Sequence, residues 1–267
     1  MTKPFVIVYD FDGTLAPGNM QEYDFIPALG VDVPSFWQQA GELAKQQEAD
    51  QILAYMQLMV HEAQYKRVQI RKADFEKFGA KIRFFEGVED WFERINAYGK
   101  ARGIEVQHFI VSSGLREMIA GTPIAKYFTK IYASGFMYDH HDVAIWPALA
   151  VNYTTKTQYL FRISKGSLEV YDNSKINKYV PPEERPVPFT NMVFIGDGET
   201  DIPSMRLLKD YGGHSIAVYN PQTHQACHVN HLLDEGRVNL VAPANYRQDS
   251  NIDQCIKILI NRMSNKG

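Results

Sequence analysis

The feature that most constrains this chain is an apolar run that ends at two aspartates. Residues Phe5–Tyr9 are all β-branched or aromatic, and Asp10 and Asp12 follow with one residue between them. A continuous apolar run is typical of a strand buried on both faces of a parallel sheet. In open α/β sheets, ligands bind beyond the carboxyl ends of the strands. The pattern predicts a site with two carboxylates, which can hold a hard cation or divide the roles of nucleophile and proton donor.

Further strand-like runs recur along the chain, with helix-like segments such as Val88–Ala101 between several of them. The predicted strands are Phe5–Tyr9, Val106–Val111, Lys130–Ala133, Met192–Ile195, Ser215–Tyr219 and Asn239–Val241. Alternation of this kind indicates crossover units around a mostly parallel sheet. The sequence therefore predicts an α/β fold.

Two segments interrupt the alternation. Residues 16–83 have almost no β-branched runs, and helix formers cluster in Phe36–Gln47, Gln51–Arg67 and Lys72–Lys81. Apolar residues from Ile52 to Val60 follow the 3.6-residue period of an amphipathic helix. Residues Gly135–Asn152 are aromatic and irregular, which suggests a hairpin flap.

Composition excludes several classes of protein. The chain has 267 residues, 45% hydrophobic and 22% charged, as in ordinary globular proteins. Its formal net charge of −3 gives no basic footprint for nucleic acid. No apolar run approaches the length of a membrane span. Two cysteines make no disulfide framework, so we expect a cytoplasmic protein. From the charge and the lack of a long apolar run, we expect neither a nucleic-acid nor a membrane partner.

Four stretches resemble, in the same order, the motifs of the haloacid dehalogenase (HAD) superfamily, most of whose members are phosphatases. They are Asp10–Leu15, Phe109–Gly114, Thr155–Thr157 and Val193–Asp201. The resemblance implies a Rossmann-like parallel-sheet core made of residues 1–15 and 84–267. It also implies that residues 16–83 form a helical cap domain, inserted after the first strand.

The resemblance implies a division of labour between the first two aspartates. Asp10 would be the nucleophile that forms an aspartyl-phosphate, and Asp12 the general acid that later activates water. Independently of the resemblance, two nearby carboxylates tend to titrate as a coupled pair, one ionised and one held protonated. Family members that dehalogenate lack an acid at the second position, because halide leaves without a proton.

The resemblance also implies a Mg²⁺ site. The carboxylates of Asp10 and Asp197 and the backbone carbonyl of Asp12 would bind the ion, since Mg²⁺ favours oxygen ligands. Asp201 would bind through water or orient Asp197. Lys156 would stabilise both the nucleophile and the transferring phosphoryl group as a point charge.

The second motif is expected to hold the substrate phosphate. Ser112 would donate its hydroxyl to a phosphoryl oxygen, and the amides of Ser113 and Gly114 would open a helix over Gly114–Ala120, where anions are favoured. Gly13 and Gly198 would let the backbone approach the ligand closely.

Several alternatives stay open at this stage. Lys165 is an alternative for the role of Lys156, and Lys175 and Lys178 are more distant alternatives. Lys156 is preferred because it lies at the start of its predicted helix, whereas Lys165 lies at the end. Asp201 also fits the N-cap of an Ile202–Leu208 helix. The side chains of His224, Cys227, His228 and His231 share one helical face, for which a polar surface is favoured over a zinc site.

The function predicted is a Mg²⁺-dependent phosphatase acting on a small phosphorylated metabolite. A phosphotransferase or mutase with the same intermediate, or a non-catalytic phosphate-binding protein, is the alternative. The motifs resemble the phosphoserine-phosphatase-like branch, in which a glutamate contacts the substrate amino group. Asn19 lies near the position that this glutamate would occupy in the sequence, and Glu22 lies three residues further along the chain. Candidates for a cap arginine are Arg67, Arg71 and Arg83, and phosphoserine, phosphocholine and sugar phosphates all remain possible substrates.

Overall fold

The apolar run before Asp10 forms β1 (Phe5–Tyr9), the central strand of a seven-stranded sheet. The computed structural model describes residues 4–68, 70–223 and 227–265. The sheet order is β4-β3-β2-β1-β5-β6-β7, and only β3 and β4 pair antiparallel. The other strands are β2 (Val106–Leu115), β3 (Phe128–Tyr138), β4 (Ala144–Leu149), β5 (Met192–Gly196), β6 (His214–Tyr219) and β7 (Leu240–Pro243). The predicted α/β fold with a mostly parallel sheet is confirmed.

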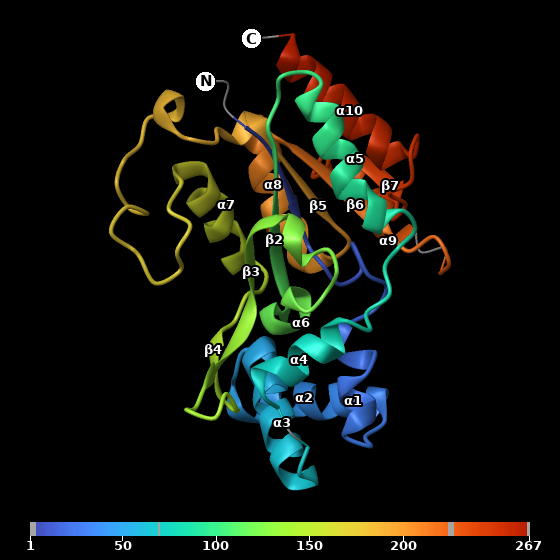
Figure 1. The fold of residues 1–267 in the computed structure, drawn as a ribbon, viewed down its shortest axis with the longest axis vertical. Helices are drawn as coiled ribbons and strands as arrows, with labels where there is room; N and C mark the ends of the chain where they lie inside the picture. The colour runs from blue at the N-terminus through green and yellow to red at the C-terminus, as the bar shows by residue number, and fades with distance from the viewer. Residues whose placement is uncertain (1–3, 69, 224–226, 266–267) are drawn as a thin grey trace.

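Helices cover both faces of this sheet (Figure 1). They are α5 (Val88–Lys100), α6 (Arg116–Ala120), α7 (Thr155–Lys165), α8 (Ile202–Asp210), α9 (Cys227–Asp234) and α10 (Asn251–Ser264). Ile7 and Tyr9 join the apolar cluster of α5 and α10, whereas Val6 and Val8 join the cluster of α7, α8 and α9. Because successive side chains of a strand point to opposite faces, β1 contributes to two cores and is apolar throughout.

Four helices from residues 16–83 lie together at one end of the molecule (Figure 1). They are α1 (Phe25–Ala28), α2 (Val33–Gln47), α3 (Gln51–Lys66) and α4 (Lys72–Gly79). Side-chain caps fix where the longer helices begin: Asp32 accepts from the amide of Ser35, and Asp50 from those of Ile52 and Leu53. Their buried apolar faces are continuous with the α5–α10 cluster.

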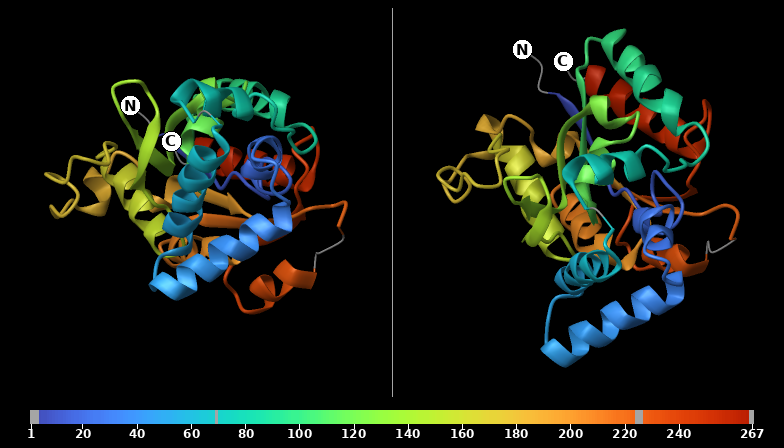
Figure 2. Two further views of the ribbon diagram at one scale, coloured as in Figure 1. Left: turned by 90° about the horizontal axis from the view of Figure 1, so that it is seen from below. Right: turned by 60° about the horizontal axis from the view of Figure 1, so that its bottom comes forward.

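The hairpin of β3 and β4 extends the sheet toward these helices (Figure 2). Its turn is hydrogen-bonded to the connection between α3 and α4. The amide of Lys72 donates to the carbonyl of Asp142 at 3.0 Å, and the amide of Ala144 donates to the carbonyl of Ile70 at 3.0 Å. The hairpin expected within residues 135–152 is therefore present, and it is tied to the helical segment by backbone hydrogen bonds.

Some boundaries differ from the predictions. β2 continues to Leu115 and α6 begins at Arg116, so Ser113 and Gly114 end a strand and do not open a helix. Helices α1 and α10 were not predicted. Short 3-10 turns occur at Met20–Glu22, Ala125–Tyr127, Pro182–Glu184, Phe189–Asn191 and Glu199–Asp201. Within the described ranges, no helix combines the length and apolar character that a membrane span requires.

Candidate active site

The carboxyl ends of β1 and β5 bring three aspartates together. The two strands are parallel neighbours with Tyr9 opposite Ile195, and the amide of Asp10 donates to the carbonyl of Ile195 at 2.9 Å. Asp10 therefore lies beside the segment that carries Asp197 and Asp201. One carboxylate oxygen from each of these three aspartates lies within 4.8 Å of the others.

Asp10 is held on both oxygens. Its side chain is buried, and Oδ1 accepts a hydrogen bond from the amide of Phe11 at 2.7 Å. Oδ2 lies 3.0 Å from Nζ of Lys156. These two contacts fix the orientation of the carboxylate before any ligand is present, which is what a positioned nucleophile requires.

Lys156 is the second residue of α7 and is fully buried. Its Nζ donates to Oδ1 of Asp201 at 2.6 Å and to Oγ1 of Thr200 at 3.3 Å. Burial alone lowers the pKa of Lys156, but the carboxylates of Asp10 and Asp201 outweigh it and raise that pKa above its ordinary value. Lys156 is therefore a permanent cation next to the Asp10 carboxylate.

The rival lysine lies elsewhere. Lys165 is the last residue of α7, and its Nζ donates to the carbonyls of Ile176 at 2.6 Å and Lys178 at 2.7 Å. These contacts satisfy the ammonium group at the far end of the helix from Lys156. Lys165 therefore binds backbone carbonyls of the loop that follows α7.

Asp12 occupies a different environment from Asp10. Its Oδ1 accepts from the amide of Met20 at 2.9 Å, and among the described residues its carboxylate is outside the cluster of three aspartates. Burial, followed by the negative charge of Asp10, raises the pKa of Asp12 well above its ordinary value. A carboxyl group that keeps its proton near neutral pH is able to act as a general acid.

The other two aspartates repel each other and Asp10. Burial, followed by the charges of Asp10 and Asp201, raises the pKa of Asp197 well above its ordinary value. Burial and the charge of Asp10 likewise raise the pKa of Asp201. Asp201 stands at the N-cap position of α8 but makes no side-chain cap, since its carboxylate is turned to Lys156.

A divalent cation fits this arrangement. The cluster offers only carboxylate oxygens, the donors that Mg²⁺ and Ca²⁺ prefer, and a cation would relieve the repulsion that disfavours their ionised forms. Gly13 leaves room for the cluster, because a Cβ at that position would lie 1.9 Å from Oδ2 of Asp197. Gly13 also has a positive φ of 72°. Gly198 has no such close neighbour, since the nearest atom to an added Cβ would be 3.9 Å away.

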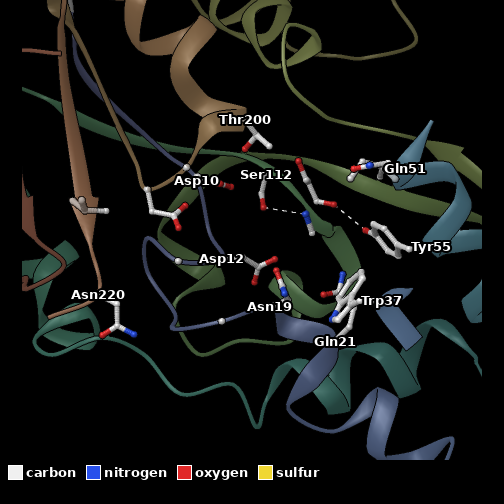
Figure 3. Close-up of a pocket in the computed structure, with 18 of the residues that line it drawn as sticks. Asp10, Asp12, Asn19, Gln21, Trp37, Gln51, Tyr55, Ser112, Thr200 and Asn220 are labelled. Carbon is white, nitrogen blue, oxygen red and sulfur yellow. Dashed lines mark hydrogen bonds between the residues drawn. The ribbon is translucent and has the colours of Figure 1, made fainter. Parts of the chain in front are cut away.

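The end of β2 lies beside Asp12, since a Cβ on Gly114 would be 2.8 Å from Oδ2 of Asp12. Oγ of Ser112 is buried and accepts from the amide of Gly114 at 3.1 Å, as the dashed line in Figure 3 shows. The hydroxyl of Tyr55, on α3, donates to the carbonyl of Ser113 at 2.8 Å. The helical segment is therefore hydrogen-bonded to the strand end beside the aspartates.

These residues line a cavity of about 680 Å³ between the helical segment and the sheet. Besides the residues from β1, β2 and β5, its walls include Asn19, Gln21, Trp37, Gln51, Tyr55, Thr200, Tyr219 and Asn220. In Figure 3 the side chains of Asn19, Gln21, Trp37 and Tyr55 gather on one side and Asn220 lies on the other. No pattern in the sequence marks Gln21 or Thr200 as site residues, although Thr200 directly precedes Asp201.

Other candidates from the sequence lie outside this cavity or outside the described residues. Arg67, Arg71 and Arg83 do not line it. His224 and the side chains of Cys227 and His228 lie outside the described parts of the chain. The alternative of a zinc site on that helical face is therefore untested.

Several known proteins are similar to this chain in sequence or in fold. An uncharacterised protein from Borreliella burgdorferi is 32% identical over 277 residues, covering 92% of this chain and 93% of that one. A probable phosphoserine phosphatase from Vibrio cholerae has a similar fold, with a TM-score of 0.59 and 14% identity over 99% of this chain and 67% of the other. A phosphoserine phosphatase solved as a phospho-aspartyl intermediate analogue gives a TM-score of 0.55 and 14% identity over 96% and 99% of the two chains.

The profile of one protein family covers most of the chain. The haloacid dehalogenase-like hydrolase family matches residues 7–206, a range that contains all four motifs, from Asp10 to Asp201. The strand-end aspartates, the buried lysine and this match lead to the same assignment. The chain belongs to the haloacid dehalogenase-like hydrolases.

Proposed function

We propose that this protein is a Mg²⁺-dependent phosphatase that hydrolyses a small phosphorylated metabolite through an aspartyl-phosphate, in the cytoplasm. The observation that carries the proposal is the contrast between its first two aspartates. Asp10 lies 3.0 Å from the buried ammonium group of Lys156, whereas burial, followed by the charge of Asp10, raises the pKa of Asp12 and favours its protonated form. A nucleophile and an acid two residues apart are what phosphomonoester cleavage needs.

The proposed reaction has two steps. An oxygen of Asp10 attacks phosphorus while Asp12 gives its proton to the departing alkoxide, so the P–O ester bond breaks and an alcohol leaves. Asp12, now a carboxylate, then takes a proton from a water molecule that attacks the phosphorus of the acyl phosphate. Inorganic phosphate leaves, and both aspartates return to their starting states.

The remaining residues neutralise and orient the phosphoryl group. Lys156 offers a fixed positive charge beside Asp10, and the hydroxyl of Ser112 with the amide of Ser113 offers donors for phosphoryl oxygens. The amide of Gly114, also expected to bind phosphate, donates to Oγ of Ser112 in this structure and would have to exchange that bond for one to the substrate. Asp10, Asp197, Asp201 and the backbone carbonyl of Asp12 would hold Mg²⁺. When bound, the ion neutralises phosphoryl charge and orients the group for attack.

Residues 16–83 are proposed to act as the cap over this site. Tyr55 on α3 is hydrogen-bonded to the Ser113 carbonyl, and Trp37 on α2 lines the same cavity. The cap would exclude bulk water during the first step and select the leaving group.

Trapping the intermediate tests the proposal. We expect wild-type enzyme, quenched in acid during turnover of an aryl phosphate, to gain the mass of one phosphoryl group on the peptide that contains Asp10. Asp10→Asn is expected to show neither turnover nor the added mass while its thermal melt stays near wild type. The matched control Asp90→Asn changes an exposed aspartate of α5 and is expected to behave as wild type.

The outcomes separate the alternatives. Substantial turnover by Asp10→Asn would remove Asp10 as the nucleophile. Transfer of the phosphoryl group to an added sugar acceptor in preference to water would identify a phosphotransferase. A pure wild-type sample that is inert at every Mg²⁺ concentration would favour a non-catalytic phosphate-binding protein.

A further inference from the structure

The loop that follows β1 is held by a residue far away in the sequence. The hydroxyl of Tyr246 donates to the backbone carbonyl of Thr14 at 3.0 Å, and both residues are fully buried. Thr14 lies two positions after Asp12, whereas Tyr246 lies between β7 and α10, outside the range 7–206 that the family profile matches. This hydrogen bond therefore joins the first motif to a part of the chain that contains none of the four motifs.

The loop after β1 folds back on itself. The amide of Leu15 donates to the carbonyl of Phe11 at 2.9 Å, and the amide of Gly13 donates to the carbonyl of Ala16 at 2.7 Å. These two hydrogen bonds tie the start of the loop to its end. A contact at Thr14 therefore restricts the position of the whole loop.

The same loop lies directly against the proposed metal site. A Cβ on Gly13 would be 1.9 Å from Oδ2 of Asp197, so the backbone and that carboxylate have no room to move toward each other. The backbone carbonyl of Asp12, a proposed ligand, belongs to this loop as well. Mg²⁺ requires near-ideal octahedral geometry with oxygens at about 2.0–2.1 Å, so a small displacement of the loop would weaken its binding.

Tyr246 is itself fixed in the fold through its backbone and its ring. Its amide donates to the carbonyl of Glu86 at 2.8 Å, and its carbonyl accepts from Nη2 of Arg94. Its ring meets that of Trp91 edge to face, with the ring centroids 5.5 Å apart. The hydroxyl therefore reaches Thr14 from a well-anchored residue.

The hydroxyl of Tyr246 also keeps its proton. Burial, followed by the electrostatic effects of Tyr9, Asp197 and Asp10, raises the pKa of Tyr246 well above its ordinary value. The group is therefore a hydrogen-bond donor at any pH at which the protein is folded. Without it, the buried carbonyl of Thr14 would lose this donor, which disfavours the present position of the loop.

We propose that Tyr246 is a positioning residue for the Mg²⁺ site, whose hydroxyl fixes the loop carrying Asp12 and Gly13 and thereby raises the affinity for the ion. This inference rests on the metal site of the proposed function. Tyr246 does not line the cavity, so it acts through the backbone of Thr14 and does not touch the substrate.

Titration of Mg²⁺ into the full chain, without substrate, tests the proposal. Tyr246→Phe removes the hydroxyl and keeps the ring, and we expect the Kd for Mg²⁺ measured by calorimetry to rise by about tenfold or more, as for other residues that orient metal ligands. The matched control is Tyr132→Phe on β3, whose hydroxyl donates to the carbonyl of Leu168 at 2.8 Å. It is expected to keep the wild-type Kd.

Turnover of an aryl phosphate gives a second readout. Tyr246→Phe retains every proposed catalytic group, so saturating Mg²⁺ should restore most of the wild-type kcat. At limiting Mg²⁺ the loss of rate should follow the rise in Kd. A merely structural role would lower the melting temperature without moving the dependence of the rate on Mg²⁺.

A second variant displaces Tyr246 without changing it. Gly87 has a φ of 81°, and a Cβ there would lie 2.5 Å from the amide nitrogen of Arg247 and 2.6 Å from the carbonyl carbon of Tyr246. Gly87→Ala is therefore expected to raise the Kd for Mg²⁺. Gly30→Ala is the matched control, since Gly30 has a φ of 66° with no atom within 4 Å of an added Cβ, and it should keep the wild-type Kd.

The outcomes separate this inference from the proposed function. An unchanged Kd in Tyr246→Phe, or equal rises in Tyr246→Phe and Tyr132→Phe, would overturn the role of Tyr246 and leave the phosphatase intact. A wild type that binds Mg²⁺ but hydrolyses no ester would overturn the phosphatase, while the Kd values would still decide the role of Tyr246. A wild type that binds no Mg²⁺ would overturn both the metal site and this inference.

Discussion

Nζ of Lys156 lies 2.6 Å from Oδ1 of Asp201, closer than the 3.0 Å that separates it from Oδ2 of Asp10. The lysine comes from the start of α7 and the aspartate from the segment between β5 and α8, so this buried ion pair joins two motifs that are far apart in the sequence. Asp201 thus fixes the cation that faces Asp10. Removing Lys156 would leave the buried carboxylate of Asp201 without its cation, whereas removing Asp201 would leave Lys156 paired with Asp10 alone.

Loss of the lysine is predicted to destabilise the protein as well as inactivate it. Lys156→Met leaves Asp10 and Asp201 without their shared cation, and we expect a loss of about 3–5 kcal/mol in the free energy of unfolding, measured by urea denaturation. Lys165→Met is the matched control on the same helix, where only hydrogen bonds to carbonyls are lost. Equal stability losses in the two variants would show that the ion pair contributes nothing special.

The protonation of Asp12 predicts a pH dependence of the chemical step. Its pKa is raised by burial and by Asp10, and a general acid works only while protonated, so kcat for an alkyl phosphate should fall as pH rises through that pKa. Asp12→Asn should lower kcat by about 10²–10⁴-fold for an alkyl phosphate and less for an aryl phosphate, whose leaving group needs little protonation. Similar losses on both esters would argue against Asp12 as the acid.

Metal removal provides a third test. We expect EDTA to abolish turnover and added Mg²⁺ to restore it, because the carboxylates of Asp10, Asp197 and Asp201 lie together and, among the described side chains, Lys156 is the one cation within salt-bridge distance of them. Mg²⁺ should also raise the melting temperature in proportion to its binding, and this rise should be absent in Asp197→Asn. Rescue by zinc alone would redirect attention to the histidine face around His231.

A buried histidine predicts how stability depends on acidity. Nδ1 of His108 is hydrogen-bonded to the hydroxyl of Tyr9 at 3.0 Å, and that hydroxyl accepts from Nε1 of Trp91 at 2.8 Å. Nε2 of His108 lies 2.9 Å from Oδ1 of Asn96. The neutral ring can make both contacts, with Nδ1 as the acceptor and Nε2–H as the donor. Burial lowers the pKa of His108 from 6.5 to about 3.

Because the folded-state pKa lies below the unfolded value, the stabilising effect is complete above pH 6.5 and is lost as pH falls toward 3. In that window His108 should contribute a loss of up to about 1.4 kcal/mol per pH unit. His108→Gln keeps a hydrogen-bonding side chain without titrating and should flatten the curve of unfolding free energy against pH. His141→Gln, exposed on the hairpin, should follow wild type, and coincident curves for all three proteins would refute the assignment.

Elements with strong local signals could be predicted from the sequence. The bounds predicted for β1 agree with the structure because its apolar run ends sharply at Asp10, and α3 follows from a periodic apolar face that begins after the capping Asp50. β4 lacked such a signal, since it is an edge strand with Pro147 inside it and exposed Ile145 and Trp146. The sequence assigns Gly114 and Leu115 to a helix, because glycine and serine mark a helix start as readily as a strand end, whereas both residues belong to β2.

The residues of the site also divide into those that a local sequence signal predicts and those that it does not. Asp10, Asp197 and Ser112 end apolar runs, so their convergence follows from the parallel order of the sheet. The contact of Lys156 with Asp201 and the hydrogen bond from Tyr55 to Ser113 depend on how separate elements pack, which no local pattern encodes. The same holds for Gln21, whose place in the cavity wall depends on the path of the chain after β1.

The two backbone hydrogen bonds that join Ile70 and Lys72 to the β3–β4 hairpin restrict how the helices of residues 16–83 can move relative to the sheet. If the helices swing away from the sheet as one body, the hairpin must swing with them, and the bend then falls within β3 where it leaves its pairing with β2. If the hairpin stays in place, both hydrogen bonds must break at each opening. Any movement of the helices that admits substrate would thereby involve β3, which lies on the opposite side of β2 from β1.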